Sequence, residues 1–129
     1  MVRATLDTNV YVSALNFGGR YSQLFGMSQA GELGIDISAH ILDELTRVLR
    51  EDFEWDGYRL KFMRDRILKL ANLVSPQRTV RVVDDPDDDR IIECAVTAGS
   101  DLILTDDKAL LRVKEFEGIK IMRPHEFLK

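Results

Sequence analysis

The chain has 129 residues, of which 45% are hydrophobic and 31% charged, and a formal net charge of −4. This length fits one domain, and the apolar content is too high for a disordered chain. No apolar run is long enough to span a membrane, the start lacks the apolar stretch of a signal peptide, and the lone Cys94 excludes an internal disulfide or a cysteine-based zinc site. We therefore expect a soluble, cytoplasmic protein whose single domain covers residues 1–129.

Short apolar runs alternate with amphipathic segments along the chain. The apolar runs predict strands at residues 2–6, 35–38, 80–83, 102–104 and 119–122. Helical spacing and capping residues predict a first helix that is capped by Thr8 or Asn9 and ends at Phe17. Further helices are expected at residues 22–30, 41–49, 60–73, 86–98 and 109–113, with a terminal turn at 125–128. Strands separated by helices favour an α/β fold, here three-layer α/β/α with a mainly parallel central sheet.

Charge is unevenly distributed along the sequence. Residues 47–81 contain nine Lys and Arg against five Asp and Glu, a net charge of +4, and acidic segments flank them on both sides. One interpretation of this basic segment is a solvated helix face. The other is an electrostatic surface that attracts phosphates.

Acidic residues follow three of the expected strands. Asp7 comes directly after the first strand, and Asp106 and Asp107 follow the strand at 102–104. Five aspartates between positions 84 and 89 lead from the strand at 80–83 into the next helix. In open α/β sheets the functional surface lies beyond the carboxyl ends of the strands. Helix capping explains one or two of the five aspartates, but it does not explain Asp7 or Asp107 at strand ends.

Carboxylates that converge at one sheet edge predict a hard divalent cation. Mg²⁺ and Mn²⁺ favour oxygen ligands, and neither His nor Cys is prominent in these segments. The two histidines, His40 and His125, are not spaced as a pair of metal ligands and are expected to be surface or packing residues. Cys94 is expected in the core. The sequence contains no Gly-rich phosphate-binding loop, and its Ser, His and Asp residues do not follow the order of a catalytic triad.

Four motifs resemble those of the PIN domain family, and together they cover most of the chain. They are Asp7-Thr8-Asn9 after the first strand and the segments 41–45, 89–95 and 104–108. The most similar branch is the prokaryotic PIN-family toxins of toxin–antitoxin systems, such as VapC. One departure is Arg50-Glu51-Asp52, which stands where that branch has Arg-Pro-Lys and which bears on substrate contacts.

The resemblance implies a metal-dependent endoribonuclease that cleaves single-stranded RNA by attack of water on the phosphodiester. The implied catalytic and metal-binding residues are Asp7, Glu44, Asp89 and Asp107, which would hold one or two Mg²⁺ or Mn²⁺ ions. Thr8, Asn9 and Thr105 would hold these ligands in place through hydrogen bonds. Asp88 remains an alternative to Asp89, and Asp106 an alternative to Asp107.

The resemblance also implies partners. These are RNA, a cognate antitoxin protein and a second copy of the chain in a homodimer, with no membrane contact. Basic residues that could hold the RNA backbone are Arg47, Arg50, Arg59, Lys61, Arg64 and Arg66.

Two other functions compete with the nuclease. The first is a catalytically silent PIN fold that serves as an interaction module, although all four acidic positions are filled. The second is a receiver-type signalling domain that binds Mg²⁺. A receiver domain normally has an acidic pair at the end of its first strand, whereas here Asp7 is followed by Thr8 and Asn9.

Overall fold

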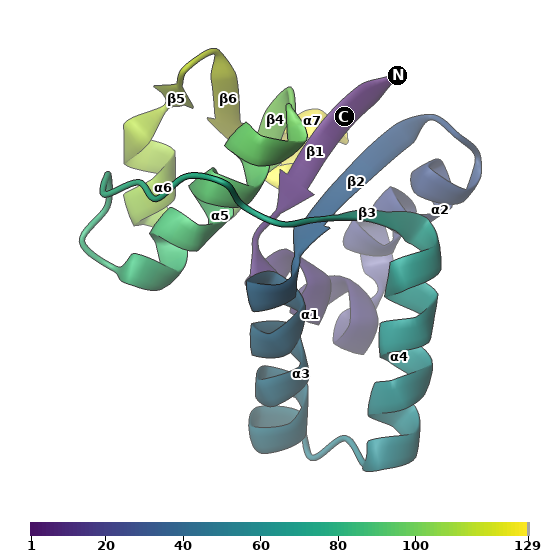
Figure 1. Ribbon diagram of the computed structural model, residues 1–129. Helices are drawn as coiled ribbons and strands as arrows, with labels where there is room; N and C mark the ends of the chain where they lie inside the picture. Colours follow the sequence, from purple (N-terminus) through teal and green to yellow (C-terminus); the bar gives the residue numbers. More distant parts are fainter. Residues whose placement is uncertain (129) are drawn as a thin grey trace.

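A six-stranded sheet forms the centre of the computed structural model, which describes residues 1–128 (Figure 1). Its strand order is β3-β2-β1-β4-β6-β5, and every neighbouring pair is parallel except β5 and β6. The strands are β1 (Val2–Leu6), β2 (Leu33–Ser38), β3 (Ala71–Val74), β4 (Leu102–Leu104), β5 (Glu115–Phe116) and β6 (Ile119–Met122). The α/β fold class and the mainly parallel sheet predicted from the sequence are confirmed.

Helices cover both faces of the sheet. Figure 1 shows α5 crossing the front of the sheet and α1 behind it, while α3 and α4 extend side by side beyond the sheet. The helices are α1 (Thr8–Phe17), α2 (Gln23–Gln29), α3 (Ala39–Phe53), α4 (Gly57–Leu70), α5 (Pro86–Ala98), α6 (Lys108–Val113) and α7 (Pro124–Phe127), with a short 3₁₀ turn at Gly19–Ser22. Among residues 1–128, no helix is long and apolar enough to cross a membrane.

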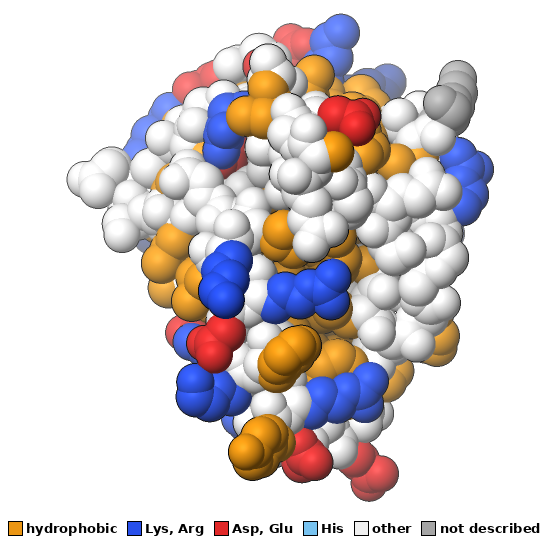
Figure 2. Space-filling view, turned by 90° about the vertical axis from the view of Figure 1, so that its right-hand side faces the viewer, with side chains coloured by type: hydrophobic (Ala, Val, Ile, Leu, Met, Phe, Trp, Pro, Cys, Tyr) orange, Lys and Arg blue, Asp and Glu red, His pale blue; other side chains and the backbone are white. Residues whose placement is uncertain are grey.

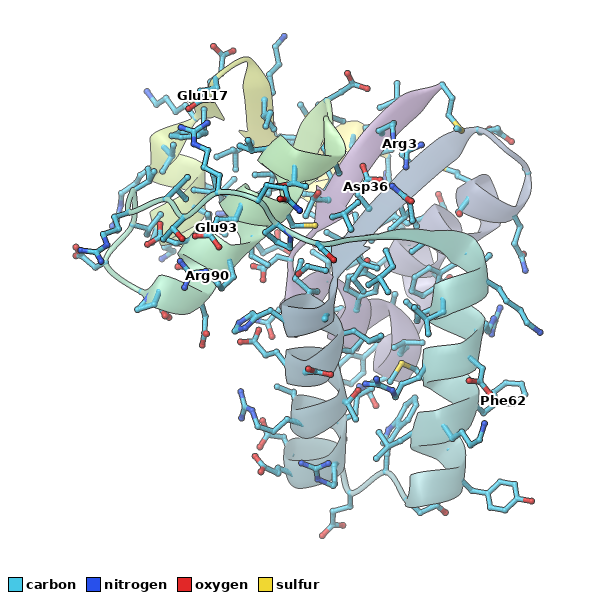
Figure 3. The ribbon with its side chains drawn as sticks, viewed as in Figure 1. Arg3, Asp36, Phe62, Arg90, Glu93 and Glu117 are labelled. Atoms are coloured by element: carbon cyan, nitrogen blue, oxygen red, sulfur yellow. The ribbon has the colours of Figure 1, made fainter. Side chains whose placement is uncertain are left out.

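Strand β2 is buried along its whole length because helices lie on both sides of it. Leu33, Ile35 and Ile37 alternate with more polar positions, one of which is Asp36. The carboxylate of Asp36 is fully buried, pairs with the guanidinium of Arg3 on β1, and accepts a hydrogen bond from Ser100 at 2.8 Å (Figure 3). One layer of the core is therefore held by a buried polar network. Cys94 is buried on the neighbouring helix α5, as predicted.

The sequence prediction of a strand at residues 80–83 is wrong, and the third strand is β3 instead. Helix α4 ends at Leu70, three residues earlier than its apolar pattern suggested, because the backbone becomes extended at Ala71 and pairs with β2. Backbone N–H groups of the 80–83 segment bond to carboxylates of α5 rather than to a strand: Val80 donates to Glu93 at 2.9 Å. Pairing with the open edge of β2 thus outweighed local helical periodicity.

Candidate metal centre

A cavity of about 400 Å³ lies at the carboxyl ends of β1 and β4. The parallel register pairs Leu6 with Leu104, which brings the residues after both strands to the same sheet edge. Helix α3 and the start of α5 close the sides of this acidic cavity. It is lined by Asp7, Asn9, Glu44, Asp85, Asp87, Asp88, Asp106 and Asp107.

Asp7 is the most enclosed carboxylate of the acidic cavity, with 7% of its surface exposed. It stands before the first turn of α1, where Thr8 or Asn9 was expected as the cap, but its carboxylate makes no capping hydrogen bond. Instead it accepts a hydrogen bond from the Thr105 hydroxyl at 2.7 Å. Burial raises the pKa of Asp7 above its ordinary value, the bond from Thr105 opposes this rise, and the charges of Asp107 and Glu44 add to it.

Asp88 lies between three other carboxylates at the start of α5. Burial, a hydrogen bond with Asp107 and the charges of Asp107, Asp7 and Asp85 together raise the pKa of Asp88 to about 8. The Asp88 carboxyl of the metal-free protein therefore holds its proton to a higher pH than an ordinary aspartate does. A divalent cation would relieve the same repulsion, so this all-oxygen donor set fits Mg²⁺ or Mn²⁺.

Asp89, chosen from the sequence as the third acidic ligand, does not line the acidic cavity. Only 4% of its surface is exposed, and its Oδ1 accepts hydrogen bonds from the backbone N–H groups of Val82 and Val83, both at 2.9 Å. Asp89 thus holds the preceding loop against α5. Asp88, the alternative left open by the sequence, lines the cavity, so the geometry favours Asp88 over Asp89 as a ligand.

Asp107 and Asp106 both line the acidic cavity, but they have different neighbours. Asp107 caps α6, accepting from the backbone N–H of Ala109 at 3.2 Å, and it contributes to the raised pKa values of Asp7 and Asp88. Asp106 is held by Arg123 at 3.1 Å and by the hydroxyl of Tyr21. Burial and this hydrogen bond raise the pKa of Tyr21 to about 12. The geometry therefore favours Asp107 as the ligand, as chosen from the sequence.

The polar residues expected to position the ligands differ in what they contact. The Thr105 hydroxyl links two of the ligands. It donates a hydrogen bond to the Asp7 carboxylate and accepts one from the backbone N–H of Asp107 at 2.9 Å. Asn9 lines the cavity directly. The buried hydroxyl of Thr8 has no hydrogen-bond partner within residues 1–128.

Sequence reasoning missed two residues at this site, Tyr21 and Arg123, which hold Asp106. Asp85 caps α5 by accepting the backbone N–H of Asp87 at 2.9 Å, so it is one of the aspartates that helix capping explains. No local pattern indicated the tyrosine or the arginine, because both come from distant segments of the chain.

The six basic residues proposed for RNA binding are absent from the described residues that line the acidic cavity. Most of them have other contacts: Arg47 pairs with Glu51, Lys61 with Asp65, and Arg64 with Asp43. Arg50 is exposed on α3. Arg59 and Arg66 line a separate apolar groove.

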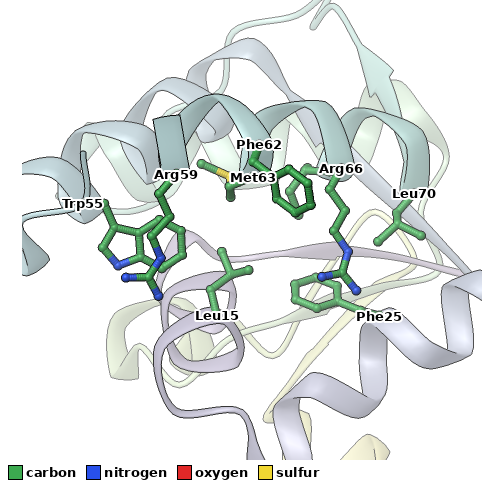
Figure 4. Close-up of a pocket in the computed structure, with 9 residues that line it drawn as sticks. Leu15, Phe25, Trp55, Arg59, Phe62, Met63, Arg66 and Leu70 are labelled. Atoms are coloured by element: carbon green, nitrogen blue, oxygen red, sulfur yellow. The ribbon is translucent and has the colours of Figure 1, made fainter. Parts of the chain in front are cut away.

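An apolar groove of about 180 Å³ lies between α4 and the helices α1 and α2. Its walls are formed by Leu15, Phe25, Trp55, Arg59, Phe62, Met63, Arg66, Ile67 and Leu70 (Figure 4). The guanidinium of Arg59 stacks 3.6 Å from the centroid of the Trp55 ring, and Phe62 is 71% exposed. Figure 2 shows apolar and basic side chains next to one another on this face.

Comparisons with known proteins agree with the observed fold. The model of the PIN domain family matches residues 3–109. Among solved structures, a chain in the crystal structure of VapBC2 from Rickettsia felis bound to a DNA fragment from the promoter superimposes with a TM-score of 0.65 and 14% identity, covering 93% of this chain and 97% of that one. No curated protein matches significantly. The family match spans most of the sequence, including the strand ends that carry the acidic cavity, and the chain therefore belongs to the PIN domain family.

Proposed function

We propose that the protein is a Mg²⁺- or Mn²⁺-dependent endoribonuclease that cleaves single-stranded RNA. The observation that carries this proposal is the acidic cavity, where Asp7, Glu44, Asp88 and Asp107 meet from four elements. Asp7 and Asp88 have raised pKa values, because both carboxyls are partly or largely buried and lie near other carboxylates. Membership of the PIN domain family supports nuclease chemistry at this site.

The four carboxylates would hold one or two cations. A bound cation supplies Lewis acidity, which makes a nucleophilic water available near neutral pH and neutralises charge on the scissile phosphate. Other contacts orient the carboxylates that would bind the cation. The hydroxyl of Thr105 fixes the rotamer of Asp7, and Asp107 is held in place as the cap of α6. Asp88 must release its proton when a cation binds. Hydrolysis by in-line attack of water leaves a 5′-phosphate and a 3′-hydroxyl.

Of the six basic residues named above, we propose Arg47 and Arg50 for contacts to the RNA backbone, because they lie on the helix that carries Glu44. Arg47 lies one helical turn beyond Glu44 on α3, so it is placed for RNA that leaves the acidic cavity along this helix. Arg50 follows one turn later on the same helix. Arg59 and Arg66 face the apolar groove instead.

Cleavage of single-stranded RNA with Mn²⁺, with Mg²⁺ and with EDTA tests the proposal. We expect cleavage with either metal, none with EDTA, and none from Asp7→Asn. Asp65→Asn is the matched control, because Asp65 is an exposed aspartate on α4 that pairs with Lys61. Cleavage that persists in EDTA would reject the metal mechanism. Metal binding without cleavage would favour the silent interaction module.

A second function, binding of an antitoxin protein, is favoured by the apolar groove. The groove combines exposed apolar side chains with Arg59 and Arg66, so it suits an amphipathic segment that carries aliphatic and acidic side chains. The fold similarity to a chain of a VapBC2 complex supports this assignment. We also propose that the toxin forms a homodimer, which analytical ultracentrifugation would test.

Trp55 is the only tryptophan of the chain and lines this groove, so its fluorescence reports on occupancy. We expect the protein encoded by a reading frame adjacent to this gene to change the fluorescence of Trp55 on titration. Phe62→Glu should weaken this binding, because it places a charge in the apolar wall. Tyr58→Ala, a change at an exposed residue outside the groove lining, is the control. Equal affinities for both variants would place the partner elsewhere.

A further inference from the structure

We propose that His40, Glu44 and Asp87 form a second cation site, which takes Zn²⁺ in preference to Mg²⁺. One donor atom from each of these side chains lies within 4.8 Å of the other two. A divalent ion about 2.0–2.2 Å from nitrogen and oxygen ligands holds those ligands roughly 3–4.4 Å apart. Small rotations of the three side chains therefore suffice to bring their donor atoms within bonding distance of one ion.

Two helices hold the three donors in place. His40 and Glu44 are four residues apart on α3, so they share one face of that helix. Asp87 lies in the first turn of α5, which contacts α3. The side chains of His40 and Asp87 are 44% and 53% exposed, so an ion can reach them from solvent. In the metal-free protein, His40 Nε2 lies 3.2 Å from Asp87 Oδ1, and a bound ion would replace this hydrogen bond.

The His40–Glu44–Asp87 site differs from the acidic cavity in its types of donor atom, and it therefore prefers a different metal. Imidazole nitrogen is a good ligand for Zn²⁺, whereas Mg²⁺ prefers oxygen ligands and keeps several waters. Three protein ligands with an open fourth position are also the usual arrangement of zinc sites that accept a water or a substrate group. Glu44 and Asp87 line the acidic cavity as well, so the second ion would lie at its rim.

Only His40 and His125 are present in the chain, so NMR of the histidine ring nitrogens reads out the site directly. His125 is exposed on α7 and is the internal control. We expect Zn²⁺ to shift the ring nitrogens of His40 at a concentration that leaves His125 unchanged, and Mg²⁺ to shift neither. Asp87→Asn should raise the Zn²⁺ concentration needed for the His40 shift at least about tenfold, because a direct ligand contributes no less than its supporting residues.

Two variants separate this inference from the proposed nuclease, with which it shares Glu44. Asp88→Asn should abolish stabilisation by Mg²⁺ but keep the Zn²⁺ shift of His40. His40→Gln should lose the Zn²⁺ response but keep stabilisation by Mg²⁺. If Zn²⁺ leaves the His40 ring unshifted, shifts both histidines together, or shifts His40 equally well in Asp87→Asn, the site does not exist. None of these results depends on RNA cleavage.

Discussion

The adjacent residues Asp88 and Asp89 should respond to substitution in opposite ways. In Asp89→Ala, Val82 and Val83 lose their acceptor, and both of these hydrogen bonds are 2.9 Å long. Hydrogen bonds to a charged group contribute about 1.5–3 kcal/mol each. Val82 is 39% exposed, so water partly replaces the loss there. We therefore expect the free energy of unfolding to fall by about 2–4 kcal/mol.

Asp88→Asn should leave the metal-free protein as stable as the wild type or more stable. The pKa of Asp88 is raised to about 8 because its ionised form is buried among other carboxylates. A neutral amide removes this repulsion. It also removes a metal ligand, so the gain in melting temperature on adding Mn²⁺ should shrink in Asp88→Asn and persist in Asp89→Ala.

Thermal melts of both variants and the wild type, with EDTA and with excess Mn²⁺, measure these effects. For a chain of this length, 1 kcal/mol corresponds to about 4 °C, so Asp89→Ala should melt roughly 8–16 °C lower than the wild type in EDTA. The reasoning is refuted if Asp89→Ala melts like the wild type in EDTA but loses its response to Mn²⁺. It is also refuted if Asp88→Asn is strongly destabilised without metal.

Three further outcomes follow from the structure. In EDTA, the free energy of unfolding should fall as the pH rises from about 4 to about 8. The unfolded chain releases the Asp88 proton near pH 3.8, whereas the folded protein keeps it until about pH 8. Urea unfolding across this range measures the slope, and Asp88→Asn should reduce that slope. Asp36→Ala should cost about 1–3 kcal/mol in urea unfolding, because the buried Ser100 hydroxyl and the partly exposed Arg3 lose their acceptor. A loss well below about 1 kcal/mol would show that water replaces these contacts. Arg47→Gln should reduce the salt dependence of RNA binding by about 0.7 units of logarithmic slope, whereas Arg59→Gln, whose side chain stacks on Trp55, should leave that slope unchanged.

The sequence by itself determined most of the framework. The segments rich in apolar residues at 2–6, 102–104 and 119–122 correspond to β1, β4 and β6, because short apolar runs between turn residues are typical of strands. Placing carboxylates directly after such strands was enough to predict that Asp7 and Asp107 meet, since parallel strands end at the same sheet edge. Glu44 was predicted from its motif, and it too lines the acidic cavity.

The tertiary structure decided what depends on relative orientation. Asp88 and Asp89 lie about 100° apart around α5, and only the packing of that helix on the sheet directs one to the cavity and the other to the loop before it. Strand β3 formed where the chain reached the open edge of β2, although its residues continued a helical pattern. His40 and Asp87 are 47 positions apart and meet because α3 and α5 pack together. Local periodicity sets which residues form an element, but the rotation and pairing of that element depend on contacts with distant parts of the chain.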